Sequence, residues 1–302
     1  MLRRSKKHQK KLAKLVLAAL LFSGGVHGLM TPSVAEAAGS VTVTGYASGN
    51  FAPDSSKMRS YYYDYSYYYA PTDGTVTELY LAQGTAQGAW SNPGIVAGHY
   101  GSGASGASGV TVNMTGTDVV VSNLYGGLAV GTGSSSTDLG TASNNIVNIS
   151  AGTVATRVAG GYSSTKSYAI DEYHYTCYGG NADGNTVTIS GDDTKVGEVS
   201  GGLSDFGGAN NNTVIVENGV NTKSVYGGES SYYYYYGLNT DVSGNTVTIR
   251  DNAKIDGTVR GGYSGAEPSN TTGLYPSANA NDNKVTISDK VEVTGSVYGG
   301  YT

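Results

Sequence analysis

A few groups of residues in this chain have types and spacing that could do chemistry. Asp171, Glu172, His174 and Cys177 lie close together, and carboxylate, imidazole and thiolate are all metal ligands. Their spacing matches no ordered metal motif, and tyrosines interleave them, so we expect no metal there. Cys177 is the only cysteine, which leaves no partner for a redox pair. We interpret it as a loop thiol without a role.

Two further patterns touch on binding and catalysis. Gly179 to Asn185 is similar to the glycine-aspartate calcium repeat of some secreted proteins, but Asp183 comes one place early and the unit does not recur in tandem. Asp256 and Arg260 lie on one expected strand, yet no neighbouring repeat supplies the second acid that polysaccharide-cleaving enzymes need. Phosphate-loop and nucleophile motifs are missing from the sequence. We predict no catalytic, cofactor-binding or metal-binding residue.

Tyrosine is the remaining candidate, because the chain holds 26 tyrosines but only 3 Phe and 1 Trp. One cluster lies at Tyr61–Tyr63, Tyr65 and Tyr67–Tyr69. Tyrosine combines a large rigid contact area with a hydroxyl group, which suits ligand binding. Packing against the scaffold, or extension of its strands, explains the clusters equally well, and both interpretations stay open. The candidate ligand-contact residues are Tyr162, Tyr168, Tyr173, Tyr175, Tyr178, Tyr232, Tyr233, Tyr234, Tyr235 and Tyr236.

The element that must position these tyrosines is a recurring phrase. It reads NTVTISGDDTKVGEVSGGLS from Asn185 and NTVTIRDNAKIDGTVRGGYS from Asn245. Similar copies start at Asn212 and Asn283, a looser one at Asn145 and a degenerate one at Gly109. Self-similarity of this kind indicates one structural unit stacked on copies of itself. The predicted repeats are 109–127, 145–163, 185–204, 212–230, 245–264 and 283–302, preceded by a cap and irregular Tyr-rich segment at 38–108 that ends in a flexible link.

Each phrase contains two short strand patterns. Val187 and Ile189 alternate with threonines in the first, and Ile255, Gly257 and Val259 alternate with polar residues in the second. We therefore predict an all-β fold, a right-handed parallel β-helix or solenoid of about six repeats. A sandwich of antiparallel hairpins is the alternative. Register breaks are expected in the copies at Asn185 and Asn212, the latter because Asn221 and Lys223 fall on the inward face.

Two small features of the phrase have structural interpretations. The glycine pair near its end is expected to turn a corner through a positive φ, which only glycine adopts cheaply. The asparagine that opens the phrase either stacks as an amide ladder or simply occupies a turn. The variable segments lie after the glycine pair and are expected to emerge as a row of tyrosine-rich loops along one edge. They are Leu128–Asn144, Tyr162–Gly184, Leu203–Asn211, Glu229–Gly244 and Tyr263–Asp282.

The first 37 residues have the pattern of a cleaved signal peptide. Seven basic residues precede an apolar run from Leu15 to Phe22, and Ala35-Glu36-Ala37 offers a cleavage site. The run is too short to span a membrane as a helix. Without this leader, 11 basic and 22 acidic residues remain, a net charge of −11. Such a balance disfavours nucleic acid and anionic membranes as partners and suits a solvated extracellular surface.

The basic leader, the Ala-x-Ala site and the Asn-Thr-Val-Thr-Ile…Val-x-Gly-Gly-Tyr-Ser repeats together resemble the passenger regions of type V autotransporters of Gram-negative bacteria. The resemblance implies a β-helical adhesin exported to the cell surface through an outer-membrane barrel, which this chain does not include. No site residue carries over. We therefore expect a non-enzymatic secreted or surface passenger that binds host-cell or matrix protein or glycan, or itself. A carbohydrate-active enzyme and a passive spacer are the alternatives, and without a barrel the location would be periplasmic.

Overall fold

The computed structural model describes residues 40–47, 58–63, 66–71, 78–82, 95–102, 106–131, 139–165, 168–169, 175–176, 179–230, 240–265 and 279–302. These residues form strands and connecting turns, and they include no helix. In particular, this part of the chain contains no helix with the length and apolarity to cross a membrane. The predicted signal peptide and Cys177 lie outside the described residues.

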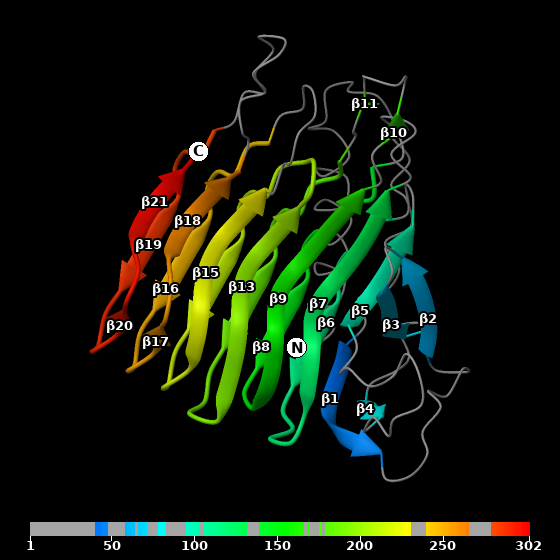
Figure 1. Cartoon of the computed structure of the whole chain (residues 1–302), viewed down its shortest axis with the longest axis horizontal. Helices are drawn as coiled ribbons and strands as arrows, with labels where there is room; N and C mark the ends of the chain where they lie inside the picture. The colour runs from blue at the N-terminus through cyan, green and yellow to red at the C-terminus, as the bar shows by residue number, and fades with distance from the viewer. Residues whose placement is uncertain are drawn as a thin grey trace, which may run out of the picture. The chain divides into compact units, whose positions relative to one another are not determined.

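The strands form two large sheets, and each repeat contributes to both (Figure 1). The first sheet has eight strands in the order β19-β16-β14-β12-β8-β6-β1-β4. Its neighbours pair in parallel, so that Val187 lies opposite Val147 on one side and Val214 on the other. Its strands are β1 (Ser40–Ala47), β4 (Glu78–Ala82), β6 (Thr111–Met114), β8 (Ile146–Ile149), β12 (Thr186–Ile189), β14 (Thr213–Val216), β16 (Thr246–Ile249) and β19 (Lys284–Ile287).

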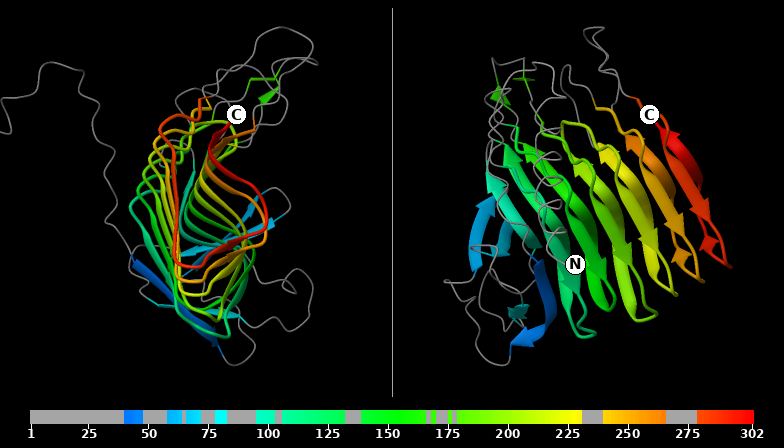
Figure 2. Two further views of the ribbon diagram at one scale, coloured as in Figure 1. Left: turned by 90° about the vertical axis from the view of Figure 1, so that its left-hand side faces the viewer. Right: turned by 180° about the vertical axis from the view of Figure 1, so that it is seen from behind.

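The second sheet has eleven strands and is parallel throughout the repeats. Equivalent strands of successive repeats lie behind one another in the left view of Figure 2. This pairing excludes the antiparallel sandwich for the described repeats. The strands are β2 (Met58–Tyr63), β3 (Ser66–Pro71), β5 (Ile95–Ser102), β7 (Val120–Gly131), β9 (Gly152–Thr165), β13 (Thr194–Ser204), β15 (Asn221–Ser230), β17 (Lys254–Ile255), β18 (Val259–Ser264), β20 (Glu292–Val293) and β21 (Val297–Tyr301).

The core lies between the two sheets and consists of stacked branched aliphatic side chains. Val187 and Ile189 of the first sheet are fully buried, as are Val199 and Val225 of the second, and all belong to one apolar cluster. Repeats with the same residue at the same place therefore put Val on Val and Ile on Ile. Each such side chain contributes about 1.5–3 kcal/mol to folding through its burial.

The predicted break in the copy at Asn185 is confirmed. The register between β13 and β9 shifts between Val196 and Glu198, because β9 is longer there. In the copy at Asn212, β15 itself runs unbroken, but its register against the following repeat shifts by one residue, since Thr222 pairs with Ile255 whereas Val225 pairs with Val259. An irregularity is therefore present, but the expected reason is wrong: Asn221 and Lys223 are exposed, and buried Thr222 takes the inward place. The alternation changes phase between Thr222 and Val225, where two residues, Lys223 and Ser224, lie between successive inward side chains. The Oγ1 of Thr222 is satisfied by donating to the Gly197 carbonyl at 2.7 Å.

Residues before the repeats extend both sheets. β1 pairs in parallel with β6, and β5 pairs in parallel with β7. Tyr61–Tyr63 and Tyr67–Tyr69 of the first tyrosine cluster lie on β2 and β3, an antiparallel pair joined to β5, so their backbone does extend strands. Tyr65 lies outside the described residues. Ala107 is buried and donates its N–H to the Thr141 carbonyl at 2.8 Å. The described end of the expected flexible link, Gly106–Gly109, is thus part of the stacked structure.

A third stacked side, which the phrase did not predict, precedes the strands that the six repeats contribute to the first sheet. The Ala142 N–H donates to the Asn181 carbonyl at 2.9 Å, and the Ala182 N–H donates to the Gly208 carbonyl at 2.9 Å. The residue that ends each of these segments has a positive φ: Gly109, Asn144, Gly184, Asn211, Gly244 and Asp282. Glycine, Asn and Asp are the residues that adopt this conformation most cheaply. The last residues of the expected loops therefore belong to the repeating scaffold.

The asparagines that open the phrase form an amide ladder in the interior, which decides between the two interpretations. Asn212 is fully buried, and its Oδ1 accepts from the N–H and the Nδ2 of Asn185 at 2.8 and 3.0 Å. Its Nδ2 donates to the Ala182 carbonyl and to Asn245 Oδ1 at 2.9 and 3.1 Å. The same pattern joins Asn145 to Asn185 and Asn245 to Asn283. Every hydrogen and the oxygen of the Asn212 amide therefore have partners.

The glycine pair leaves room for the asparagine ladder, which packs directly against it. The expectation that these glycines adopt positive φ is wrong. Neither Gly201 nor Gly202 has a positive φ. A Cβ on Gly201 would lie 2.3 Å from the Gly227 carbonyl oxygen and 2.8 Å from the Asn212 Cβ. A Cβ on Gly202 would lie 2.2 Å from the Ala182 carbonyl oxygen. Glycine is required because the backbone and the ladder approach too closely for any side chain.

Candidate functional site

The outer face of the second sheet carries aligned polar and aromatic side chains. Along β15, Val225 enters the core, whereas the next residue, Tyr226, points to the other side of the sheet. In-phase pairing aligns such residues in columns, so Tyr226 lies opposite Ser200 on β13 and Arg260 on β18. The adjacent column holds Leu203, Glu229, Tyr263 and Tyr301. The repeats thus turn single positions into rows of neighbouring side chains.

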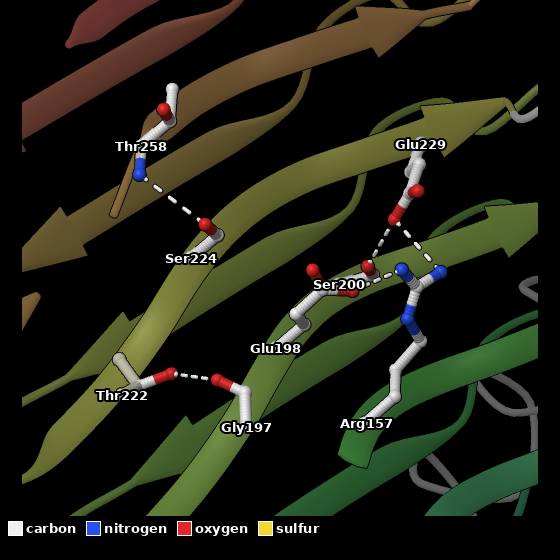
Figure 3. Close-up of polar contacts among 8 residues, drawn as sticks. All are labelled: Arg157, Gly197, Glu198, Ser200, Thr222, Ser224, Glu229 and Thr258. Atoms are coloured by element: carbon white, nitrogen blue, oxygen red, sulfur yellow. Dashed lines mark hydrogen bonds and ion pairs between the residues drawn. The ribbon is translucent and has the colours of Figure 1, made fainter. Parts of the chain in front are cut away.

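An ion cluster occupies one part of this outer face (Figure 3). Arg157 on β9 donates to Glu198 on β13 and also contacts Glu229 Oε2 on β15 at 3.2 Å. The Ser200 hydroxyl donates to the same Glu229 oxygen at 2.8 Å. Arg157 therefore sits between two carboxylates from the next two repeats, and Glu229 is only 5% exposed.

Burial and charge perturb the ionisation of this cluster in definite directions. Burial raises the pKa of Glu229, and the favourable contacts with Arg157 and Ser200 do not cancel that effect. Burial alone would lower the pKa of Arg157, but the carboxylates of Glu229 and Glu198 outweigh it and raise that pKa. Burial, followed by the charge of Glu229, raises the pKa of Tyr226.

Four tyrosines surround Arg260 further along the same face. The Arg260 Cζ lies 4.4 Å from the ring centre of Tyr263 and 4.7 Å from that of Tyr301. It lies 5.7 Å from the ring centres of both Tyr226 and Tyr298. The rings also contact one another, with Tyr263 and Tyr301 centred 5.8 Å apart. These distances fit cation–π contacts, which hold the guanidinium in place without a carboxylate.

This group, which we call the tyrosine-arginine platform (Tyr226, Arg260, Tyr263, Tyr298 and Tyr301), is open to solvent at its edge. Tyr298 is 37% and Tyr301 44% exposed, and both lie on β21, the last strand, which pairs only with β18 among the described strands. The tyrosines lie directly beside the glycine pair of the phrase: Tyr226 and Tyr298 precede it, and Tyr263 and Tyr301 follow it, Tyr263 as the first residue of the variable segment Tyr263–Asp282. Sequence reasoning placed the ligand-contact tyrosines in the variable segments. The signal that could have found the platform is the Val-Tyr-Gly-Gly and Gly-Gly-Tyr pattern, read as two outward columns.

The structure describes only part of the tyrosines predicted to contact ligand. Tyr162 lies in β9 and is half-buried. Its ring centre is 5.2 Å from that of Tyr125, and its hydroxyl donates to Asp205 Oδ2 at 3.1 Å. Tyr168 and Tyr175 lie in the short antiparallel pair β10 (Tyr168–Ala169) and β11 (Tyr175–Thr176). The others, Tyr173, Tyr178, Tyr232, Tyr233, Tyr234, Tyr235 and Tyr236, lie outside the described residues.

The other sequence patterns can now be placed. Asp183 of the calcium-like segment hydrogen-bonds to the next repeat, because its Oδ1 accepts from the Asn210 N–H at 2.7 Å. Asp256 is exposed, and Arg260 lies in the platform. A search of the described residues for three or more clustered His, Cys, Asp or Glu side chains finds none. Asp171 to His174 and Cys177 lie outside those residues. Comparisons of this chain with protein-family models, curated proteins and solved structures found no match.

Proposed function

We propose that this protein is a non-enzymatic adhesion module, a right-handed parallel β-helix that binds its target through the outer face of the second sheet and the loops that continue from it. The platform of tyrosines around Arg260 is the observation that carries the proposal. It presents aromatic area and a cation on a scaffold whose backbone groups are already paired from repeat to repeat. Recognition of another molecule on this face therefore depends on its side chains.

The chemistry of the platform suits binding to another molecule. Exposed tyrosine offers a flat apolar ring and a polar hydroxyl on a side chain with little conformational freedom, so little entropy is lost when it makes contact. Tyrosine and arginine are also the residues enriched at energetic centres of interfaces. A host-cell or matrix protein or glycan, or a second copy of this chain, would meet this surface.

We place the protein at the cell surface or in the extracellular medium as a type V autotransporter passenger. The grounds are those of the sequence: the basic leader, the cleavage site and the repeat pattern. Parallel pairing between copies, in both sheets, is what such a stacked passenger requires.

The test compares binding to host cells, matrix preparations and glycan arrays by the full chain and by a Tyr298→Ser/Tyr301→Ser variant. We expect binding to fall about 10-fold or more, as for loss of interface anchors. The control is Ile146→Ser, which removes an exposed apolar side chain, 40% exposed, from the outer side of the first sheet. A deletion of Tyr232–Tyr236 measures how much the loops contribute to binding independently of the outer face of the second sheet. Equal binding by all variants would refute adhesion through either surface.

A carbohydrate-cleaving enzyme is the second candidate, and the Arg157 cluster is the observation that favours it. Glu198 and Glu229 supply on adjacent repeats the two acids that the sequence did not place together. We rank it lower because Arg157 occupies both acids and Glu229 is nearly inaccessible. Release of reducing sugar from pectin-like polymers, abolished in Glu198→Gln, would support the enzyme over the adhesin.

A further inference from the structure

We infer that the tyrosine-arginine platform recognises acidic polysaccharide, with Arg260 binding a sugar carboxylate and the tyrosine rings lying against the sugar. This inference rests on the proposed adhesive function and names the class of its target.

Arg260 has no carboxylate partner within the described part of the protein. The other arginines of the repeats have carboxylate partners: Arg157 contacts Glu198 and Glu229, and Arg250 contacts Glu217. For Arg260 the described residues supply four aromatic rings but no ion pair. Its Nε is buried and has no hydrogen-bond partner among them. Arg260 as a whole is only half-buried, and its terminal nitrogens are not among the buried unpaired atoms, so a ligand can supply acceptors to them although the enclosed Nε stays out of reach. Hydrogen bonds to a charged group of this kind add affinity.

The shape of the guanidinium selects the acceptor. Its planar N–H fork matches the two oxygens of a carboxylate, and such charge-assisted bonds are the strongest hydrogen bonds proteins make. The rings hold the cation without neutralising it. Glu229 lies opposite Tyr263 on the neighbouring strand, but Arg157 and Ser200 already engage its Oε2. The carboxylate at the platform is therefore expected to come from outside.

The face favours a sugar polymer over a peptide or nucleic acid. A peptide adds to a sheet through main-chain hydrogen bonds at an edge. The backbone of β18, which carries Arg260, is paired on both sides, with β15 and β21, so a ligand over Arg260 meets side chains and not a free strand edge. The open edge among the platform strands is that of β21. Nucleic acid brings about one charge per 1.7 Å and needs a basic surface, but the chain without its leader carries a net −11. A sugar ring has an apolar face for the tyrosine rings and hydroxyls for their rims, and one carboxylate for Arg260.

The experiment measures binding of the full chain to oligogalacturonate and to the same oligomer after its carboxyl groups are reduced to alcohols. We expect oligogalacturonate to bind at least about 10-fold more tightly, as one charged hydrogen-bonded pair allows. Arg260→Gln should abolish that preference, so that the acidic and the reduced oligomer bind alike. Arg260→Lys keeps the charge without the fork and should retain part of the preference. Arg250→Gln removes the same charge near the first sheet and should change nothing.

The outcomes distinguish failure of the carboxylate site from failure of the proposed adhesive function. Binding without preference for the acidic oligomer, or an equal loss in Arg260→Gln and Arg250→Gln, overturns the carboxylate site but leaves adhesion standing. Poly-glutamate that binds as tightly, with the same dependence on Arg260, overturns the sugar in favour of an acidic peptide. Absence of binding to cells, matrix and every glycan refutes both proposals. If Arg260→Gln does not fold, as checked by circular dichroism, the preference of the wild-type chain and the Arg260→Lys result decide.

Discussion

Replacement of Asn212 by alanine tests whether the buried amide ladder holds successive repeats together. The side chain is fully buried and takes part in four hydrogen bonds, two as acceptor and two as donor. Alanine leaves the Asn185 N–H, one hydrogen of Asn185 Nδ2 and the Ala182 carbonyl without the partners shown in the structure. Asn245 Oδ1 is spared, because it still accepts from the Asn212 N–H at 2.9 Å.

The expected loss follows from that count. Each buried group that loses its partner costs about 1–3 kcal/mol. The vacated space is polar, so a water molecule can enter and restore part of the loss. We therefore expect the free energy of unfolding to fall by about 3–6 kcal/mol. That is a large fraction of the total for a typical domain.

The assay is urea unfolding followed by circular dichroism in the strand region, with the slope of the transition recorded, since a stacked array need not unfold in one step. Asn148→Ala is the matched control, because half-buried Asn148 Nδ2 makes only one cross-strand bond, to Asn113 Oδ1 at 2.9 Å. It should cost about 0.5–1.5 kcal/mol. A difference between the two variants below about 1 kcal/mol would refute the reasoning.

Two further predictions concern the glycine pair and the ion cluster. Gly201→Ala should destabilise the protein by several kcal/mol or prevent folding in a thermal melt, because its Cβ would lie 2.3 Å from a backbone oxygen. Gly109→Ala meets nothing within 4 Å and should cost only about 1–2 kcal/mol through its positive φ; equal losses would contradict this account. Burial raises the pKa of Glu229, so the folded state binds the Glu229 proton more tightly than the unfolded state does. Protonated Glu229 therefore adds to the free energy of unfolding at low pH, and this gain is lost as pH rises through the folded pKa. Glu229→Gln should remove that component from a series of urea unfolding curves at different pH, and an unchanged pH dependence would count against it.

Much of the fold could be predicted from the phrase. Alternating Val and Ile at equivalent places in several copies predicts an all-β structure of parallel stacked strands, and this is confirmed. The handedness of the proposed β-helix stays a prediction. In the copy at Asn212 the place of the irregularity was expected, but its inward residue was assigned wrongly, because a period of two puts Asn221 and Lys223 inside whereas Thr222 is the buried residue. Thr222 is buried because pairing aligns it with Val196 and Ile255, not because of its own polarity.

The candidate site was harder to predict, since its members are far apart in the chain. Arg157 and Glu229 meet only because three strands lie side by side. The tyrosine clusters can be recognised in the sequence because many tyrosines lie close together there. Tyr226 and Tyr301 lie far apart in the sequence and meet around Arg260 only through strand pairing. The tyrosine-rich segments remain candidates, and most of them lie outside the described residues.

The amino-acid sequence by itself determined the repeating unit, its strand pattern and its apolar interior, because side-chain alternation and repetition are local properties of the chain. Only the tertiary structure decided which outward side chains become neighbours, why both glycines are needed, and that the asparagines are joined from repeat to repeat. The physical reason is the register of parallel strands: it brings residues tens of positions apart into contact, and a shift of one residue would turn each strand's outward side chains inward.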